Sequence, residues 1–516
     1  MSVPAPRSPR TIFFLGSTAG FGANALSQVI GIVSVPLGLR YFGASRYGIW
    51  VVISSVVGYL SLSQLGIAAA AQTLIAKASS PDQQRSLFQR SLFLGTLGAL
   101  VAVAALLVVR YSVPGWVNIL GRLPLSTHAE AEGAAWATAL LFLLQVPTNV
   151  FGVAFAALLE IHWERFYLAL GKVAALAALV TTILLQGDLR TLALLTGAAS
   201  LGVGVASGIH LFLVHPAMRF TLRGSSCQTA SSQSVLASGV RFLAISIAAM
   251  AVWNSNSLII SHYLGLADVA QYSVYFRLFC VGFSLLILVN GVLWPMYGAA
   301  AGANNWAWVQ RTYGRTVHLL AILGGLLWVG GISFAPQIVS LWAGSGFRGG
   351  LLLPFALGGY GYSLSLVCSH TTVLNALNAT WGMVAFAFAE ALANVCFTVA
   401  FIRLMGIGGV ALGMLLGAVT TVFWISPLYL DFRTAGRVQF QMRHIVIHGF
   451  LALLPALALA CWLAAFGPSG SAGIILRLGL ILLYLGASWY TTSSDLRSFV
   501  LGMLHRLIDN RRVMTR

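Results

Sequence analysis

Residues 268–315 read DVAQYSVYFRLFCVGFSLLILVNGVLWPMYGAAAGANNWAWVQRTYGR, and this stretch decides the class of fold. It predicts one long apolar helix over residues 272–293 that carries a single cation, Arg277. Pro295 predicts the end of that helix, because proline lacks a backbone N–H and disfavours helical backbone just before it. Since a charge inside a lipid-spanning helix is costly and faces a partner or a wet cavity, Arg277 is a candidate functional residue.

The composition of the whole chain is that of a membrane protein with many spans. Of its 516 residues, 59% are hydrophobic and 8% are charged, whereas soluble domains carry about 25% charged residues. No polar stretch is long enough for a soluble domain, which needs about 50 residues or more. Although the net charge is +18, the cations are spread over short loops, as membrane topology requires, and do not indicate nucleic-acid binding.

Apolar segments long enough to cross a membrane recur along the chain, since a spanning helix needs about 20 apolar residues. The sequence predicts fourteen spans, at roughly 12–38, 46–76, 87–110, 133–158, 165–186, 189–214, 235–263, 270–294, 312–335, 350–377, 381–403, 408–428, 444–466 and 471–490. Residues 493–512 follow as an amphipathic helix expected to lie on the membrane surface.

The distribution of Lys and Arg predicts the orientation. With the N-terminus in the cytoplasm, 20 of the 29 cations fall in inside segments and nine are external or intramembrane. Cytoplasmic loops carry the excess of Lys and Arg, so both termini are expected in the cytoplasm, which requires an even number of spans.

A weak internal repeat divides the chain into two lobes. YFGASRYGIW at 41–50 and YLGLADVAQYSVY at 263–275 each follow the first span of a half, and the polar stretch 215–234 reads as a linker. Secondary transporters often have such repeats, with a site at their interface. The predicted domains are an N-lobe of six spans (1–225), a C-lobe of six spans (226–430), and a final part with spans thirteen and fourteen and the cytoplasmic amphipathic tail (431–516).

Polar side chains recur at helical spacing in several predicted spans, where residues three or four apart share a face. The candidates for substrate binding, besides Arg277, are Asn24, Gln28, Gln145, Asn149, Asn254, Ser257 and Asn375. Interhelical hydrogen bonds, worth about 0.6 kcal/mol each, are one explanation, and a hydrated cavity between the lobes is the other. The concentration of polar residues in spans one and seven, the first of each lobe, favours the cavity. By contrast, the glycines spaced four apart from Gly409 to Gly417 suit close helix packing.

Glu390 lies ten residues into its span and precedes Asn394 and Thr398 on the same helical face. A carboxyl at this depth cannot easily reach the interface. We therefore consider a coupling site for H⁺ or Na⁺ formed by Glu390 and Asn394, or a static ion pair or hydrogen bond. For Arg277, the alternative to substrate binding is snorkelling of its guanidinium to the interface.

The motifs of common enzymes are absent from the sequence. The chain has no Gly-Lys-Ser/Thr phosphate loop and no His-Glu-x-x-His. His444 and His448 are the only histidine pair at metal-ligand spacing within one span, and two histidines alone make a weak site. We therefore expect no ATP hydrolysis, no cofactor and no metal centre.

Three stretches resemble a known family. RYFGASRYGIWVVISSVVGYLSLSQLGIAAA (40–70), LGLADVAQYSVYFRL (264–278) and LWPMYGAAAGANNWAWVQRTYGRTVHL (293–319) are similar to the O-antigen flippases, the polysaccharide-transporter branch of the multidrug/oligosaccharidyl-lipid/polysaccharide exporter superfamily. The resemblance implies an all-α, multi-pass protein of the bacterial inner membrane with the two-lobed fold of multidrug exporters. It also implies flipping of undecaprenyl-diphosphate-linked oligosaccharides by rocking lobes, for O-antigen, capsule or exopolysaccharide, alongside a polysaccharide polymerase and assembly machinery.

The chain departs from the family pattern in two places. Members often have an acidic residue in the seventh span, where this chain offers only Asn254 and Asn256. Residues 12–38 contain no cation, whereas members that flip the peptidoglycan precursor have several cations in the first lobe. The first departure argues against a coupling role at that position, and the second argues against that substrate.

Two other functions stay open from the sequence. A cation-coupled multidrug exporter of the same superfamily would need more than one acidic group in its cavity, and Glu390 is the only clear one. A membrane-embedded glycosyltransferase or ligase would need a sizeable external domain or loop, and the external loops predicted here are short.

Overall fold

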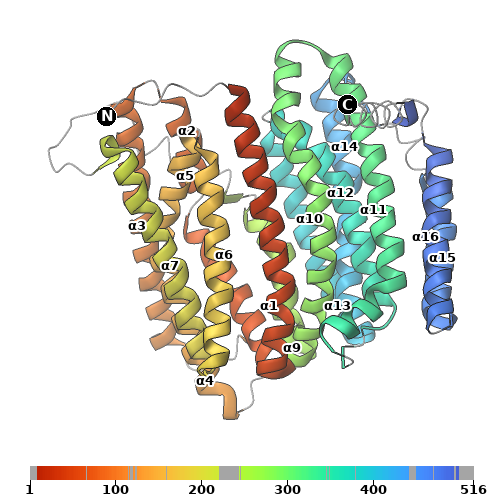
Figure 1. Cartoon of the computed structure of the whole chain (residues 1–516), viewed down its shortest axis with the longest axis horizontal. Helices are drawn as coiled ribbons and strands as arrows, with labels where there is room; N and C mark the ends of the chain where they lie inside the picture. The colour runs from red at the N-terminus through yellow and green to blue at the C-terminus, as the bar shows by residue number, and fades with distance from the viewer. Residues whose placement is uncertain are drawn as a thin grey trace, which may run out of the picture. The chain divides into compact units, whose positions relative to one another are not determined.

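The computed structural model describes residues 9–64, 67–219, 243–440, 449–492 and 496–498, apart from short gaps at 79, 114–115, 117–119, 122–124, 159, 245, 345, 348, 378 and 469. The described elements are α-helices and short 3-10 turns (Figure 1). The chain forms two compact units, Met1–Ser273 and Val274–Arg516. The predicted domain boundaries at 225/226 and 430/431 stay predictions.

The first unit is built from α1, α2, α3, α4, α5, α6, α7, α9 and three 3-10 turns, and α10 begins in it. Their bounds are α1 Pro9–Leu60, η1 Ser61–Gln64, α2 Ile67–Lys77, α3 Pro81–Ser112, α4 Leu125–Gln145, η3 Val146–Thr148, α5 Asn149–Ala157, α6 Ile161–Leu184, α7 Leu189–Val214, η4 Pro216–Met218 and α9 Ser255–Tyr263.

The second unit contains the rest of α10 and six further helices. Their bounds are α10 Leu266–Gly302, α11 Trp306–Trp342, α12 Leu352–Ala376, α13 Thr380–Thr420, α14 Val422–Arg433, α15 Gly449–Phe466 and α16 Ser471–Thr491. The α15–α16 hairpin packs against α11.

The core of the first unit lies among α2, α3, α5 and α7. Phe88 and Phe155 are fully buried there, together with Ile67 and Ile75 of α2 and Leu211 of α7. In a membrane, lipid is as apolar as these side chains, so close van der Waals packing is the main source of their contribution to stability.

The two copies of the repeated motif meet inside the first unit. Gly43 (φ 73°) kinks α1, and Gly265 (φ 132°) separates α9 from α10. Only glycine adopts such left-handed backbone freely. Beyond the kink, Gly48 lies so close to the backbone carbonyl of Leu266 that a Cβ at this position would overlap it. The repeat thus marks a contact of α1 with the start of α10.

Helix α12 lies at the centre of the second unit, where α11, α13 and α14 pack against it. Its glycines make room for aromatic rings. The ring of Phe283 from α10 occupies the place of a Cβ at Gly361, and the indole of Trp328 from α11 lies against Gly358 and Gly359. Small residues in α12 therefore let bulky rings from two neighbouring helices pack close to its backbone.

Helix α13 folds back on itself at Gly406, where the backbone is non-helical (φ 57°, ψ −140°). A Cβ at Gly413 would overlap Thr398, and one at Gly417 would meet Asn394 at 2.9–3.2 Å. The two segments therefore run antiparallel with their backbones in close contact. This confirms the packing role predicted for these glycines.

The predicted helix end at Pro295 is wrong, because α10 continues through it to Gly302. Proline removes one backbone hydrogen bond, the one from its own nitrogen to the residue four earlier. Helices in membrane proteins tolerate this loss, since neighbouring helices and local adjustments satisfy the freed group. Here that earlier residue is Gly291, which is exposed and has no Cβ.

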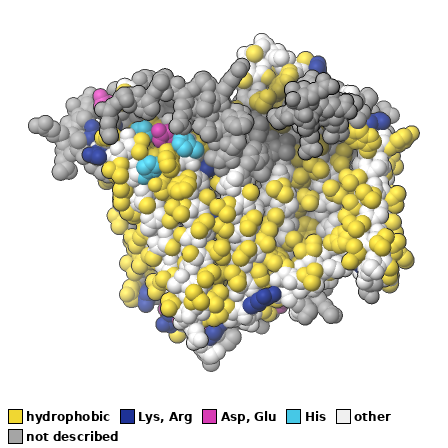
Figure 2. Space-filling model, viewed as in Figure 1, with side chains coloured by type: hydrophobic (Ala, Val, Ile, Leu, Met, Phe, Trp, Pro, Cys, Tyr) yellow, Lys and Arg dark blue, Asp and Glu magenta, His cyan; other side chains and the backbone are white. Residues whose placement is uncertain are grey.

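Among the described residues, ten helices are long and apolar enough to cross a membrane, and Leu451–Phe466 is a shorter apolar helix. Two of the ten ranges, Gly22–Leu60 and Trp381–Arg433, contain the kinks at Gly43 and Gly406. Figure 2 shows hydrophobic side chains covering the outer faces of the helices in view. The chain is therefore an all-α, multi-pass membrane protein, and the count of fourteen spans stays a prediction.

Several predicted features lie outside the described residues. These are the linker beyond residue 219, most of the tail 493–512, and the pair His444 and His448.

Candidate functional site

The polar residues predicted in the first span lie on α1. Asn24 and Gln28 are partly exposed, and the Gln28 amide donates to Asn24 Oδ1 at 3.5 Å. Their spacing of four residues places both side chains on one face of the helix. The hydrogen bond between the two side chains agrees with their predicted placement on one face of the helix.

Gln145 and Asn149 flank a break in the fourth predicted span. Helix α4 ends at Gln145, the 3-10 turn η3 contains Pro147, and α5 begins at Asn149. Thr148 Oγ1 donates to the carbonyl oxygen of Gln145 at 2.7 Å, which satisfies an acceptor exposed by the break. Both predicted site side chains are partly exposed.

The polar face of α9 is packed against protein. Ser257 is buried, and a Cβ added at Gly58 of α1 would lie 2.7 Å from Asn254 Nδ2. The neighbouring Asn256 donates to Val252 O at 3.2 Å and to the Tyr272 hydroxyl at 3.4 Å. The glycine in α1 thus makes room for the Asn254 amide between two helices.

Arg277 lies on α10 in the second unit and is partly buried. Its Nε is buried without a hydrogen-bond partner. In the part of the chain that the structure describes, no ion pair includes Arg277. An unpaired guanidinium at this depth has donors for an anionic ligand, as expected of a functional cation in a membrane.

Glu390 and its two polar neighbours occupy different environments on α13. Glu390 is partly exposed, whereas Asn394 and Thr398 are fully buried against the glycines of the second segment. Thr398 Oγ1 donates to Asn394 Oδ1 at 3.4 Å. Asn375, on α12, is partly exposed. The predicted coupling pair therefore contains one residue of intermediate exposure, Glu390, and one amide enclosed by helix packing, Asn394.

Three buried polar side chains in the second unit were not predicted from the sequence. The hydroxyl of Tyr313 on α11 and Nδ1 of His370 on α12 are 2.8 Å apart, and both side chains are buried. Asn290 on α10 is 3% exposed, and neither of its amide atoms has a hydrogen-bond partner. In the sequence, the signal for these residues was a single Asn or His within an apolar helix. Buried polar groups without partners, such as the Asn290 amide, are uncommon in proteins.

His215 and Glu160 form an ion pair that joins the segment after α7 to the segment before α6. His215 Nε2, beyond α7, lies 3.2 Å from Glu160 Oε2, which precedes α6. The hydrogen bond from His215 lowers the pKa of Glu160, and this outweighs the opposing effect of burial. Trp163 packs edge-on to the ring of His210 with centroids 4.3 Å apart. Figure 2 shows histidine and acidic side chains together on this part of the surface.

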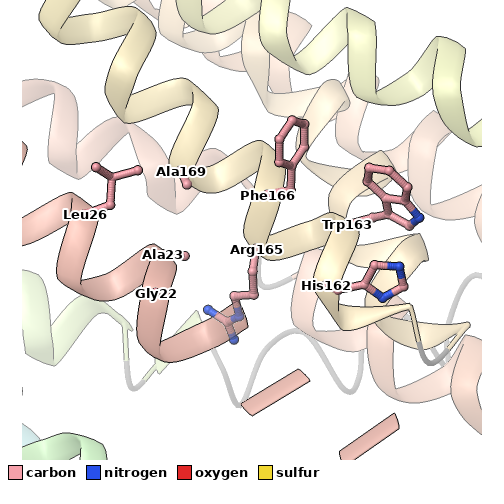
Figure 3. A pocket seen from close by; sticks show the side chains of 8 residues that line it. All are labelled: Gly22, Ala23, Leu26, His162, Trp163, Arg165, Phe166 and Ala169. Atoms are coloured by element: carbon pink, nitrogen blue, oxygen red, sulfur yellow. The ribbon is translucent and has the colours of Figure 1, made fainter. Parts of the chain in front are cut away.

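A cavity of about 350 Å³ lies between α1 and α6 (Figure 3). Its lining residues, none of them predicted from the sequence, are Gly22, Ala23, Leu26, His162, Trp163, Arg165, Phe166 and Ala169. In the described residues, no group of three or more His, Cys, Asp or Glu side chains is placed to hold a metal ion.

Comparison with known proteins identifies a family and several similar proteins. The family described as "Polysaccharide biosynthesis protein" matches residues 16–300, more than half of the chain. A protein of Salmonella typhi named as an O-antigen transporter is 20% identical over 83% of this chain and 98% of its own length. A second protein of that name, from Salmonella typhimurium, is 25% identical over 36% of this chain. In that match this chain spans only 44% of the length of the relative.

Solved structures share the fold. The lipid II flippase MurJ in an inward closed conformation has a TM-score of 0.68 at 14% identity, covering 94% of this chain and 100% of its own. An inward-facing multidrug resistance transporter of the MATE family, in the MOP superfamily, has a TM-score of 0.63 at 16% identity, covering 84% and 96%. The fold is therefore that of MurJ and the MATE transporters. With the match over residues 16–300, the chain belongs to the polysaccharide biosynthesis protein family.

Proposed function

We propose that this protein is a flippase that carries undecaprenyl-diphosphate-linked oligosaccharide units across the bacterial inner membrane by alternating access. The units would be intermediates of O-antigen, capsule or exopolysaccharide assembly. The observation that carries the proposal is the unpaired guanidinium of Arg277 in a transporter of this family. In low dielectric, such a group offers a diphosphate or an acidic sugar a charge-assisted, bidentate hydrogen bond.

Amide and hydroxyl groups complete the proposed recognition. Those of Asn24, Gln28, Asn149 and Asn375 are partly exposed on their helices. Such groups pair with sugar hydroxyls, and the polyprenyl chain can stay in the bilayer while the headgroup crosses about 30 Å of hydrocarbon. Gln145, Asn254 and Ser257 belong to the same proposed set of contacts.

The proposed topology has fourteen spans, with two lobes of six spans, a C-terminal pair and both termini in the cytoplasm. The excess of Lys and Arg in the predicted inside segments supports this orientation. The kinks at Gly43 and Gly406 support a count above ten, because each divides a long helical range into two segments. A polysaccharide polymerase and assembly machinery would receive the flipped unit.

The return of the empty carrier would be coupled to H⁺ or, as the alternative, Na⁺. Glu390 supports this proposal as a partly exposed carboxyl within a spanning range and without an ion pair among the described side chains. A carboxyl whose access to water changes with conformation can take up a proton on one side and release it on the other. Asn394, one turn further along α13, would influence Glu390 through the packing of that helix.

The test is a flipping assay in proteoliposomes with a fluorescent undecaprenyl-diphosphate oligosaccharide. Arg277→Ala should lower the initial flipping rate at least about tenfold, since one charge-assisted hydrogen bond is lost in low dielectric. Arg277→Lys should keep part of the rate, because it retains the charge but loses the planar fork. Arg433→Ala, at the exposed end of α14, is the matched control and should flip normally.

A wild-type rate in Arg277→Ala would remove the role of this residue and favour snorkelling. No flipping by the wild-type protein, together with efflux of a cationic dye, would instead favour a multidrug exporter.

A further inference from the structure

The cavity between α1 and α6 is lined mainly by apolar residues, with Arg165 and His162 as the two ionisable side chains in its lining. Arg165, His162 and Trp163 come from the first turns of α6, and Gly22, Ala23 and Leu26 come from α1 (Figure 3). The distribution of Lys and Arg predicts that this end of α6 is cytoplasmic. A cavity at such a position meets the headgroup layer, where arginine and tryptophan side chains are favoured.

The guanidinium of Arg165 is available for a ligand. Its side chain is 44% exposed, and its only ion pair among the described residues is a loose one, with Nε 3.7 Å from Glu164 Oε2. That contact involves the Nε edge of the guanidinium. A guanidinium has five N–H donors, so others remain for a ligand. The remaining donors can bind two oxygens of one phosphate, which is the geometry that arginine serves best.

An apolar track continues from the cavity along both helices. On α1 the exposed Val29 and Val33 follow Leu26 at helical spacing, and on α6 the exposed Val173 and Val180 follow Phe166 in the same way. Residues at these offsets share one face of their helix. Because α1 and α6 pack against each other, the two rows can hold a hydrocarbon chain that starts at the cavity.

We propose that the cavity binds the phosphodiester of an anionic membrane phospholipid, with an acyl chain on the track between α1 and α6. The cavity offers one full cation beside a carboxylate, Glu164, which matches a phosphodiester with a single negative charge. A diphosphate carries more charge, so it would require further cations and would be repelled by Glu164. The proposed site is thus distinct from the site proposed for the transported lipid at Arg277.

The test measures lipid binding to the purified full-length protein in detergent by native mass spectrometry. Phosphatidylglycerol is the probe, phosphatidylcholine is the zwitterionic comparison, and farnesyl diphosphate represents a polyprenyl diphosphate. We expect phosphatidylglycerol to bind in preference to both. Arg165→Gln should weaken its binding about tenfold, because a charge-assisted hydrogen bond to phosphate is lost. Arg433→Gln, which removes an equal charge elsewhere, should leave binding unchanged.

A second pair of variants tests the cavity itself and leaves Arg165 in place. A Cβ at Gly22 or at Gly20 would meet no atom within 4 Å. Gly22 lines the cavity, whereas Gly20, two residues earlier, does not. Gly22→Phe should therefore fill the cavity and block binding, while Gly20→Phe should bind normally. Thermal unfolding in lipid-free detergent establishes that each variant is folded.

Three results would overturn the proposal. The first is equal binding of phosphatidylglycerol by Arg165→Gln and Arg433→Gln. The second is unchanged binding by Gly22→Phe. The third is displacement of phosphatidylglycerol by an equal or lower concentration of farnesyl diphosphate, which would identify the cavity as a subsite for the transported lipid. Because binding is measured without flipping, each result is independent of the flipping assay.

Discussion

Glu160 and His215 show how a single ion pair ties two chain segments at one end of the first unit. Their side chains are 29% and 28% exposed, so the interaction is partly screened, and a hydrogen bond of this kind contributes about 1 kcal/mol. The hydrogen bond from His215 lowers the pKa of Glu160. A carboxyl with a lowered pKa contributes stability that is present above its unfolded-state pKa and is lost as pH falls through its folded-state pKa.

We therefore expect Glu160→Gln to lower the thermal unfolding temperature in detergent at pH 7. The difference from wild type should shrink as the pH falls below the ordinary glutamate pKa of about 4.3, and it should vanish once the pH has passed the lowered pKa of the folded-state carboxyl. Glu132→Gln is the control, because no ion pair among the described side chains includes Glu132. A pH-independent difference would show that the effect comes from packing and not from the charge of Glu160.

Glu390 is the residue on which the proposed coupling depends. Glu390→Gln keeps the shape of the side chain and its capacity for hydrogen bonds but cannot ionise. We expect this variant to fold and to bind substrate, yet to lose the dependence of flipping on an imposed pH or Na⁺ gradient in proteoliposomes. Glu132→Gln should respond to the gradient like wild type. Gradient dependence that persists in Glu390→Gln would exclude Glu390 as the coupling residue.

At the scale of elements, close contacts between helix backbones rest on glycines. Gly413 and Gly417 allow the second segment of α13 to lie against Thr398 and Asn394 of the first. Gly48 does the same where α1 meets Leu266 at the start of α10. In a membrane, such small residues allow the close approach that stabilises helix pairs.

Gly48→Ala tests this contact. The added methyl group would overlap the carbonyl of Leu266, which is backbone and cannot rotate away. We expect a loss of about 1–3 kcal/mol, the usual effect of overpacking, seen as a lower unfolding temperature in detergent. Gly171→Ala on α6, where a Cβ meets no atom within 4 Å, should unfold like wild type. Equal unfolding temperatures for the two variants would mean that the contact can relax without loss of stability.

At the scale of the whole molecule, the orientation in the membrane follows from where Lys and Arg lie. The positive-inside rule predicts that both termini lie in the cytoplasm. Reporter fusions after residues 225 and 516 should both give a cytoplasmic signal, and fusions after residues 188 and 345 should give a periplasmic one. A periplasmic signal at 225 or 516 would contradict the fourteen-span topology.

The sequence by itself determined the class, the family and the approximate helical segments. Long apolar runs with few charges allow no other structure, because backbone groups in lipid must be satisfied within helices. The motif around Gly43 and Gly48 and its second copy around Gly265 indicated the family. The sequence also made Arg277 a candidate functional residue, because a cation within a long apolar run is costly to bury.

Only the tertiary structure decided which helical faces are covered. In the structure α10 continues through Pro295, Asn394 is enclosed against Gly417, and a cavity lies beside Arg165. The spacing of residues could not predict these features. The same pattern of apolar and polar residues along a helix occurs whether its faces contact lipid, protein or a cavity. Hydrophobic periodicity is local to one helix, whereas burial and cavities depend on neighbours that are distant in the chain.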